Sequence, residues 1–372
     1  MNKELINIKE TNKKYQKVLV CPLDWGLGHA TRCIPIIQTL IDAGADVYIA
    51  GDGESMKLLA DEFPAVRQLF LKGYRIRFSR RWSVGTYLLY NLPRLTLRIF
   101  KEHFELNDLI KSHGFDIVIS DNRYGLWSKK AFSVFITHQL NIIPPSSFKC
   151  TMSVLRFITR FFIKKYSACW IPDVEESPGL SGNLSHRHPI PPNVKYVGVI
   201  SRITCGDDVK DRTDTYSLVA VLSGPEPHRT AFEKILRQQL PLLQEKSLLI
   251  RGITGTDNSE AVTGNLTIID YAGSETLSSL YKSAGVIICR GGYSTLMDLS
   301  VNGNKVICVP TPGQTEQEYL SQLMASRGYA VYSSQKEFNA AECLMKVDKT
   351  TGIPQLTRTK LTQVINELLK HA

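Results

Sequence analysis

Short apolar runs rich in β-branched residues alternate with helical patterns along most of the chain. This alternation predicts parallel sheets covered by helices, because parallel strands need a crossover connection that is usually a helix. We therefore expect an α/β fold. The expected strands of the first half lie near residues 17–23, 46–50, 115–120 and 133–137, with a helix at 29–43, and those of the second half lie near 217–222, 247–251, 266–270, 286–289 and 305–309.

A region of different composition separates the two sets of strands. It contains a segment dense in Pro, Gly, Ser and His at 178–192, one short expected strand at 194–199 and a polar stretch at 205–215. A chain of 372 residues exceeds the usual size of one hydrophobic core. We predict two Rossmann-like domains, at 1–200 and 201–372, with a last helix that can pack back on the first domain. A cleft between two such sheets would bind ligands at the carboxyl ends of the strands.

The formal charge of +10 suits nucleic acid, an anionic membrane surface or phosphorylated ligands. Basic and aromatic residues mix without acidic ones at 72–101 and 149–166, a pattern that suits the headgroup region of an anionic bilayer. Two amphipathic helices with solvated basic faces are the alternative. No recognition motif for nucleic acid accompanies these segments, so we expect no nucleic-acid partner.

Targeting and metal-binding patterns are not visible in the sequence. There is no export signal, no apolar stretch long enough to span a bilayer, and no metal-ligand spacing among the eight cysteines. We expect reduced thiols, no bound metal and a cytoplasmic location, at the inner face of the plasma membrane if the basic-aromatic segments bind there.

The loop DWGLGHATR at 24–32 follows the first expected strand and opens a helix. Gly26 and Gly28 permit a tight turn and close approach of the backbone to a ligand. A dinucleotide-binding fingerprint would need a third glycine where Thr31 stands, so hydride transfer is not favoured. His29 lies at the mouth of this loop, where an imidazole can accept a proton from an acceptor hydroxyl near neutral pH.

Two further residues follow neighbouring strands. Asp121 ends the strand at 115–120, where its carboxylate could orient His29 and stabilise the imidazolium, although a helix N-cap is the alternative role. His138 follows the next strand and is an alternative base by the same position. Arg32 and His138 complete the expected acceptor-side set with Gly26 and Gly28.

The segment CRGGYSTLMD at 289–298 combines a strand, a double glycine and a helix with a hydroxyl in its first turn. Backbone N–H groups of Gly292 to Ser294 can meet phosphate oxygens, and Asp298 can bind two ribose hydroxyls, so the segment predicts a cradle for a nucleotide diphosphate. A later helix begins with Thr315-Glu316-Gln317 and presents a carboxylate and an amide suited to sugar hydroxyls.

The segment 289–322 resembles the C-terminal signature of glycosyltransferase family 28, which includes the bacterial peptidoglycan N-acetylglucosaminyltransferase and is more distantly similar to glucuronosyltransferases. The resemblance implies a GT-B fold, a UDP-sugar donor, inversion at the anomeric carbon and no metal or other cofactor. A histidine also ends the family's N-terminal glycine loop, which supports His29. The resemblance implies these donor contacts: Gly291, Gly292, Ser294 and Thr295 for the diphosphate, Asp298 for the ribose, Glu316 and Gln317 for the sugar, Arg202 for the diphosphate, and Ser223 in a loop that departs from the family pattern.

The expected function is transfer of a hexose-type sugar from a UDP-sugar to a hydroxyl acceptor, with lipid-linked acceptors among the candidates. Two alternatives remain open. One is a non-hydrolysing UDP-sugar epimerase of the same fold, and the other is a non-catalytic protein that binds a nucleotide sugar.

Overall fold

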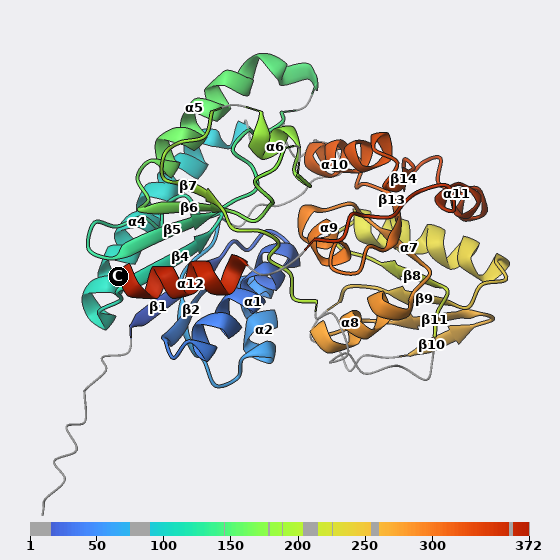
Figure 1. Cartoon of the computed structure of the whole chain (residues 1–372), viewed down its shortest axis with the longest axis horizontal. Helices are drawn as coiled ribbons and strands as arrows, with labels where there is room; N and C mark the ends of the chain where they lie inside the picture. Colours follow the sequence, from blue (N-terminus) through green and yellow to red (C-terminus); the bar gives the residue numbers. More distant parts are fainter. Residues whose placement is uncertain are drawn as a thin grey trace, which may run out of the picture.

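The computed structural model describes residues 16–74, 90–144, 146–177, 179–187, 189–203, 215–224, 226–253, 260–356 and 360–371. These residues form two sheets that lie side by side, each flanked by helices (Figure 1). All neighbouring strands are parallel except one pair at the edge of the second sheet. The predicted α/β class, with two sheets of parallel strands, is confirmed.

The first sheet has the strand order β3-β2-β1-β4-β5-β6-β7. Its strands are β1 (Lys17–Pro22), β2 (Asp46–Gly51), β3 (Arg67–Phe70), β4 (Ile117–Asp121), β5 (Phe132–Ile136), β6 (Ala168–Ile171) and β7 (Val194–Tyr196). The helices of this half are α1 (Leu27–Asp42), α2 (Gly53–Glu62), α4 (Leu92–His113), the 3₁₀ turn η1 (Ser146–Thr151), α5 (Met152–Ile163) and α6 (Asn183–His186).

The second sheet has the strand order β10-β11-β9-β8-β12-β13-β14. Its strands are β8 (Leu218–Val221), β9 (Ser247–Ile250), β10 (Ala261–Thr263), β11 (Leu266–Ile269), β12 (Val286–Cys289), β13 (Lys305–Cys308) and β14 (Ala330–Tyr332). The helices are α7 (His228–Gln239), η2 (Leu240–Leu242), α8 (Ser274–Ser283), α9 (Tyr293–Leu299), α10 (Thr315–Ser326), α11 (Ala340–Val347) and α12 (Lys360–His371).

Four strands were not expected from the sequence, and each is short or exposed. β3 is largely exposed, β10 and β14 have three residues each, and β6 has four. β10 pairs antiparallel with β11 through a tight turn at Gly264, whose φ is +61°. The strand expected at 194–199 ends at Tyr196, because Gly198 has a φ of +78° that leaves the extended region.

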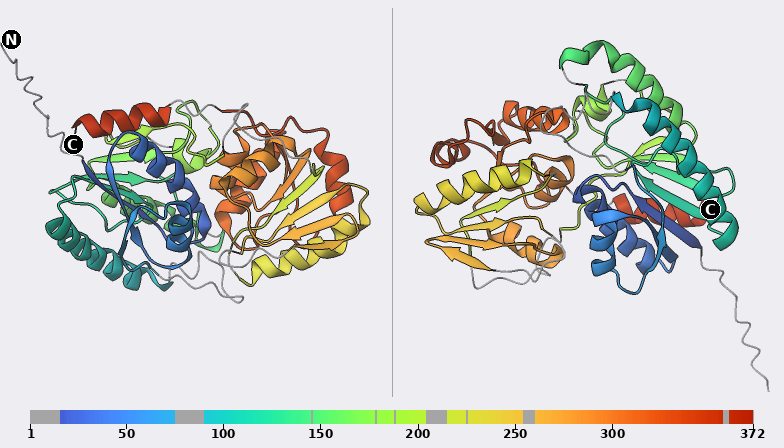
Figure 2. Two further views of the ribbon diagram at one scale, coloured as in Figure 1. Left: turned by 90° about the horizontal axis from the view of Figure 1, so that it is seen from below. Right: turned by 180° about the vertical axis from the view of Figure 1, so that it is seen from behind.

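The last helix crosses back to the first sheet, where it appears in red against the N-terminal half in both figures (Figures 1 and 2). Leu361, Val364, Ile365 and Leu368 of α12 are buried in one core cluster with α1, β1 and β4. Burial of such side chains stabilises by roughly 1.5–3 kcal/mol each. The helix that follows the second sheet in the chain therefore packs on the first half.

The other helices of the first half leave an apolar and basic surface in contact with solvent. α4 and α5 lie beside one another, and the rings of Phe100 and Phe162 join them with centroids 6.5 Å apart. Among the described residues, no helix is both long enough and apolar enough to cross a bilayer.

Candidate active site

The predicted site residues lie at the point in each sheet where the strand order reverses direction. In the first sheet this point lies between β1, which leads into the loop with Gly26 and Gly28, and β4, which ends at Asp121. In the second sheet it lies between β8, which leads to Ser223, and β12, which leads to Gly291. Open α/β sheets bind ligands at this position, outside the carboxyl ends of the strands.

The two reversal points are in direct contact with each other. Ser294 Oγ at the start of α9 donates a hydrogen bond of 2.9 Å to the carbonyl oxygen of Gly28 at the start of α1. A Cβ at Gly28 would lie 3.2 Å from Ser294 Oγ, so glycine permits this close approach. Tyr293 donates to the carbonyl oxygen of Pro172 at 2.7 Å, and Thr315 donates to that of Ile143 at 2.8 Å. The carboxyl ends of the two sheets therefore face one another.

His29, Asp121 and Arg32 form a compact cluster on the first half. His29 Nδ1 lies 2.7 Å from Asp121 Oδ1, and Arg32 Nε donates to Asp121 Oδ2 at 2.7 Å. Arg32 Nη2 also donates to Asp121 Oδ1 and lies 3.1 Å from His29 Nδ1. Asp121 is fully buried, whereas the side chain of His29 keeps 16% of its surface exposed. Of these three side chains, only the imidazole of His29 is therefore accessible to a ligand.

The contact with Asp121 fixes the tautomer of His29. The contact with Asp121 is shorter than the 3.1 Å approach of Arg32 Nη2, and a carboxylate oxygen can only accept. Nδ1 of His29 therefore carries the proton that it donates, and the lone pair lies on Nε2. Within the part of the chain that the structure describes, Nε2 has no hydrogen-bond partner. The arrangement thus leaves an oriented base on a side chain that is partly exposed.

His138 links this cluster to the second half. Its Nδ1 lies 3.3 Å from Arg32 Nη1, and its Nε2 lies 2.8 Å from Glu316 Oε1 at the start of α10. Gln139 also donates through Nε2 to the other carboxylate oxygen of Glu316. The ring of His138 stacks on that of Tyr293, with centroids 4.1 Å apart and planes 3° from parallel.

The charges of this network follow from burial and contact. Burial would raise the pKa of Asp121, but Arg32 and His29 outweigh it and hold the pKa below its ordinary value. Burial lowers the pKa of His138, and the opposing effect of Glu316 does not restore it. His138 is therefore neutral near pH 7. Burial would raise the pKa of Glu316, but the contact with His138 outweighs it and leaves that pKa below its ordinary value.

The double glycine after β12 is shaped by close packing. Gly291 has a φ of +66°, and a Cβ there would lie 2.2 Å from Ser321 Oγ, so no larger residue fits without movement. Gly292 is the N-cap of α9. Gln317 lies close to it, since a Cβ added at Gly292 would be 3.8 Å from Gln317 Nε2. Gln317 Oε1 accepts from the backbone N–H of Thr311 at 2.9 Å.

Arg290 stabilises the same turn through buried hydrogen bonds. Its guanidinium is buried and donates to the carbonyl oxygens of His228 and Val309, at 2.7 and 3.2 Å, and to Gln335 at 2.8 Å. Burial lowers the pKa of Arg290 to about 10, which leaves it charged at neutral pH. This side chain is a support of the turn and has no exposed face for a ligand.

Asp298 and Arg202 lie together where the chain passes from the first half to the second. Asp298 is buried, accepts a hydrogen bond from Ser201 Oγ through Oδ1, and has Oδ2 3.8 Å from Arg202 Nε. Two nitrogens of Arg202, Nε and Nη1, are buried without a hydrogen-bond partner among the described residues. Asp298 balances the charge of Arg202 at this distance, and the nitrogens that make no hydrogen bond among these residues can donate to an anionic ligand.

The remaining predicted residues occupy less constrained positions. Ser223 and Thr295 are half-buried, and Gly26 precedes α1 with a φ of +76° and open space around it. Arg32 was grouped with the acceptor-side loop, yet it lies within α1 with only 2% of its surface exposed. Its part in the cluster was missed, although its spacing of three residues from His29 on a helix indicates that both share one face.

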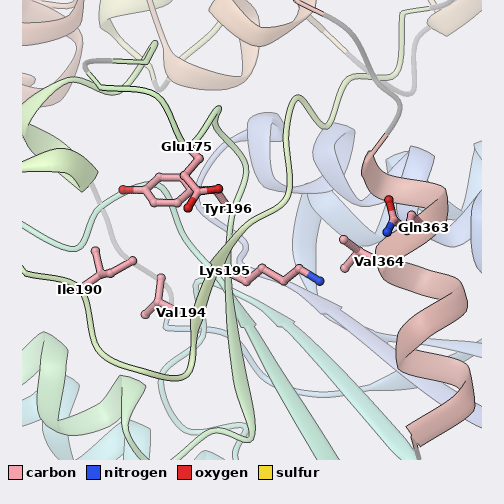
Figure 3. A pocket seen from close by; sticks show the side chains of 7 residues that line it. All are labelled: Glu175, Ile190, Val194, Lys195, Tyr196, Gln363 and Val364. Carbon is pink, nitrogen blue, oxygen red and sulfur yellow. The ribbon is translucent and has the colours of Figure 1, made fainter.

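Other features lie apart from this cluster. Figure 3 shows a cavity of about 240 Å³ between β7 and α12, lined by Lys195 and Tyr196 on one side and by Gln363 and Val364 on the other. Its lining includes none of the residues of the His29 cluster. Within the described ranges, no group of three or more His, Cys, Asp or Glu side chains is placed to hold a metal ion.

Known proteins are similar to this chain in sequence and in fold. Residues 219–370 match the model of the glycosyltransferase family 28 C-terminal domain. The UDP-N-acetylglucosamine--N-acetylmuramyl-(pentapeptide) pyrophosphoryl-undecaprenol N-acetylglucosamine transferase of Rippkaea orientalis is 23% identical over 330 residues, which cover 83% of this chain and 82% of that protein. An uncharacterized glycosyltransferase of Methanosarcina acetivorans is 24% identical over 358 residues, 89% of each chain.

Solved structures of glycosyltransferases match nearly the whole chain. MurG of Acinetobacter baumannii has a TM-score of 0.57 at 12% identity and covers 96% of this chain and 100% of its own. The glycotransferase of kitacinnamycin has a TM-score of 0.60 at 9% identity, with 96% and 95% coverage. The fold is therefore GT-B. Together with the family model and the relatives, it identifies a glycosyltransferase that resembles family 28, and that prediction is confirmed.

Proposed function

We propose that this protein transfers a hexose-type sugar from a UDP-sugar to a hydroxyl group of its acceptor, with inversion at the anomeric carbon and without a metal ion or other cofactor. One observation carries the proposal: His29, paired with Asp121, lies beside the residues that would hold a donor, and His138 joins the two sets through Glu316. The names of relatives specify UDP-N-acetylglucosamine and an undecaprenol-linked acceptor, so these are the first substrates to test.

The base in this mechanism is His29. Its Nε2 takes the proton of the acceptor hydroxyl as the hydroxyl oxygen bonds to the anomeric carbon, and the bond from that carbon to the diphosphate oxygen breaks. UDP leaves with the bonding electron pair, and Asp121 stabilises the imidazolium that forms. His138 does not take this role, because its Nδ1 accepts from Arg32 and its Nε2 carries the proton that it donates to Glu316.

The donor would lie against the second half. The nitrogens of Arg202 that make no hydrogen bond among the described residues support a contact with the diphosphate, and the start of α9 offers its backbone N–H groups. Asp298 adjoins Arg202 and offers carboxylate oxygens for ribose hydroxyls. Glu316 and Gln317 would contact the sugar from the start of α10.

A binding experiment tests the donor side first. A ligand that binds only the native state stabilises it by about 2.7 kcal/mol at 100 times its dissociation constant. We expect UDP-N-acetylglucosamine or another UDP-sugar to raise the melting temperature of the wild type and of His29→Ala. Asp298→Asn should lose this response, whereas Asp348→Asn on the exposed C-cap of α11 should keep it. A response that survives Asp298→Asn intact would contradict the ribose contact.

A turnover experiment tests the chemistry. UDP release with an undecaprenol-linked acceptor should fall by about two orders of magnitude or more in His29→Ala, because general base catalysis contributes that much. His138→Ala should chiefly raise the KM for the donor. Chelation of divalent ions with EDTA should leave the rate unchanged. Unchanged turnover in His29→Ala refutes the mechanism, and an epimerised UDP-sugar formed without any acceptor supports the epimerase instead.

We also propose that the exposed face of α4 and α5 binds an anionic membrane surface. Four aromatic or aliphatic side chains there are more than half exposed, namely Leu97, Phe104, Val154 and Phe157. The basic residues Arg94 and Lys101 are exposed on α4, and Lys164 is exposed at the C-cap of α5. Apolar side chains surrounded by cations suit anionic headgroups, each nearby cation contributing about 1 kcal/mol. The part of the basic-aromatic prediction that falls on residues 75–89 lies outside the described residues.

Vesicle co-sedimentation tests this surface. The protein should sediment with vesicles that contain phosphatidylglycerol and should remain in solution with pure phosphatidylcholine, and 0.5 M salt should weaken binding. The double substitution Phe104→Ser and Phe157→Ser should reduce sedimentation at least tenfold. Leu242→Ser is the matched control, because Leu242 is 83% exposed on the other half of the molecule. Equal losses in both variants would mean that this face is not the binding surface.

A further inference from the structure

Arg32 is a buried cation that contacts every polar group of the acceptor-side cluster. It lies one helical turn after His29 on α1. Its guanidinium holds both carboxylate oxygens of Asp121, lies 3.1 Å from Nδ1 of His29 and lies 3.3 Å from Nδ1 of His138. Because the guanidinium group is planar and rigid, its contacts with Asp121, His29 and His138 restrict the positions of all three side chains.

The contact with His138 determines where the proton of that ring lies. Arginine has five donors and no acceptor, so Nδ1 of His138 accepts from Arg32. The proton of the neutral ring is therefore on Nε2, which donates to Glu316 Oε1 at 2.8 Å. Glu316 selects the same tautomer, because a carboxylate can only accept, so the contacts at the two ring nitrogens agree.

The contact with Asp121 changes what that carboxylate does to His29. In a simple histidine–aspartate pair, the carboxylate favours the protonated ring. Here Arg32 neutralises Asp121 and brings a positive charge within 3.1 Å of Nδ1. The charged or titratable groups that face His29 from the packed elements are Asp121 on β4, Arg32 on α1, His138 after β5 and Glu316 on α10.

We infer that Arg32 is the positioning residue of this site: it keeps His29 in the proton-accepting form and, through His138, couples that base to Glu316 on the donor side. The inference rests on the proposed function in treating His29 as the base. It assigns Arg32 no contact with a substrate, in contrast to a role in the acceptor-side loop. A purely structural arginine would stabilise the fold without setting either the charge of His29 or the tautomer of His138.

The electrostatic part is tested by NMR of the histidine rings in the free protein. The His29 resonance is assigned from its loss in His29→Gln, and its protonation midpoint is compared between the wild type, Arg32→Gln and Arg32→Lys. Removal of the cation should raise the midpoint by about one pH unit or more in Arg32→Gln, whereas Arg32→Lys keeps the charge and should shift it less. The acid limb of the pH–rate profile should move in the same direction. An unchanged or lower midpoint in folded Arg32→Gln overturns the inference.

The tautomer part needs no variant that could fail to fold. Ring ¹⁵N shifts of wild-type His138 should show a single neutral tautomer, protonated at Nε2. A proton on Nδ1 in the wild type overturns the inference. Both NMR readouts are taken without substrate, so they stand or fall separately from the transfer reaction, which the turnover of His29→Ala tests.

Discussion

The turn at Gly291 gives the sharpest test of how close packing shapes the donor side. In Gly291→Ala the residue keeps a φ of +66°, which costs an L-residue about 1–2 kcal/mol. The new Cβ would also lie 2.2 Å from Ser321 Oγ, and overpacking of this kind costs about 1–3 kcal/mol. The free energy of unfolding should therefore fall by about 2–5 kcal/mol.

A matched control separates the two costs. Gly328 follows α10 with a φ of +74° and has no heavy atom within 4 Å of its Cβ position. Gly328→Ala should therefore show only the cost of the left-handed conformation, about 1–2 kcal/mol. Ser321→Ala in the Gly291→Ala background removes the clashing oxygen and leaves Cβ of residue 321 at 3.4 Å, so it should restore about 1–3 kcal/mol.

Urea unfolding with linear extrapolation measures the wild type, both glycine variants, Ser321→Ala and the double variant. The double-mutant cycle then gives the coupling between positions 291 and 321. If Gly291→Ala costs no more than Gly328→Ala, or if Ser321→Ala restores nothing, the reasoning that this turn is set by contact with α10 is wrong. A donor-dependent rise in melting temperature should be smaller in Gly291→Ala than in Gly328→Ala.

Two further predictions concern buried charge and the last helix. Asp121→Asn leaves Arg32 buried without its carboxylate and should cost about 3–5 kcal/mol at pH 7. The pKa of Asp121 is held below its ordinary value of 3.8, so its contribution is fully present above about pH 5 and is lost as pH falls. The gap in unfolding free energy between wild type and variant should therefore narrow from about pH 5 to pH 2. Ile365→Ala should cost about 2–5 kcal/mol by thermal or urea unfolding, while Asn366→Ala on the exposed side of α12 should stay within about 0.5 kcal/mol, and equal effects would contradict the packing of this helix.

Much of the site was predictable because parallel α/β sheets place their ligand residues by rule. Each of His29, Asp121 and Gly291 follows or ends an apolar strand in the sequence, and the rule that such positions gather at one edge of a sheet brings them to the two reversal points. Among the strands that were missed, β3 is largely exposed at the edge of the first sheet and β14 has only three residues at the edge of the second. Neither gives an apolar run long enough to be recognised.

The contacts across the two halves were not predictable, because they join residues far apart in the chain. His138 and Glu316 are separated by 178 positions, and Ser294 and Gly28 by 266. Their meeting depends on how two independently patterned sheets are oriented, and no local periodicity encodes that orientation. The N-cap alternative for Asp121 also needed the structure, which shows its carboxylate bonded to His29 and Arg32.

The sequence by itself determined the α/β class, the glycine turns and the residues that end the strands, because backbone preferences and the burial of apolar runs act over a few neighbouring positions. Only the tertiary structure decided that the side chain of Arg32 is buried against Asp121 and that His138 is a neutral ring bonded to Glu316. It also decided that α12 packs on the first sheet. These outcomes depend on which charges and apolar faces meet once both halves have folded, and burial then fixes their protonation and their partners.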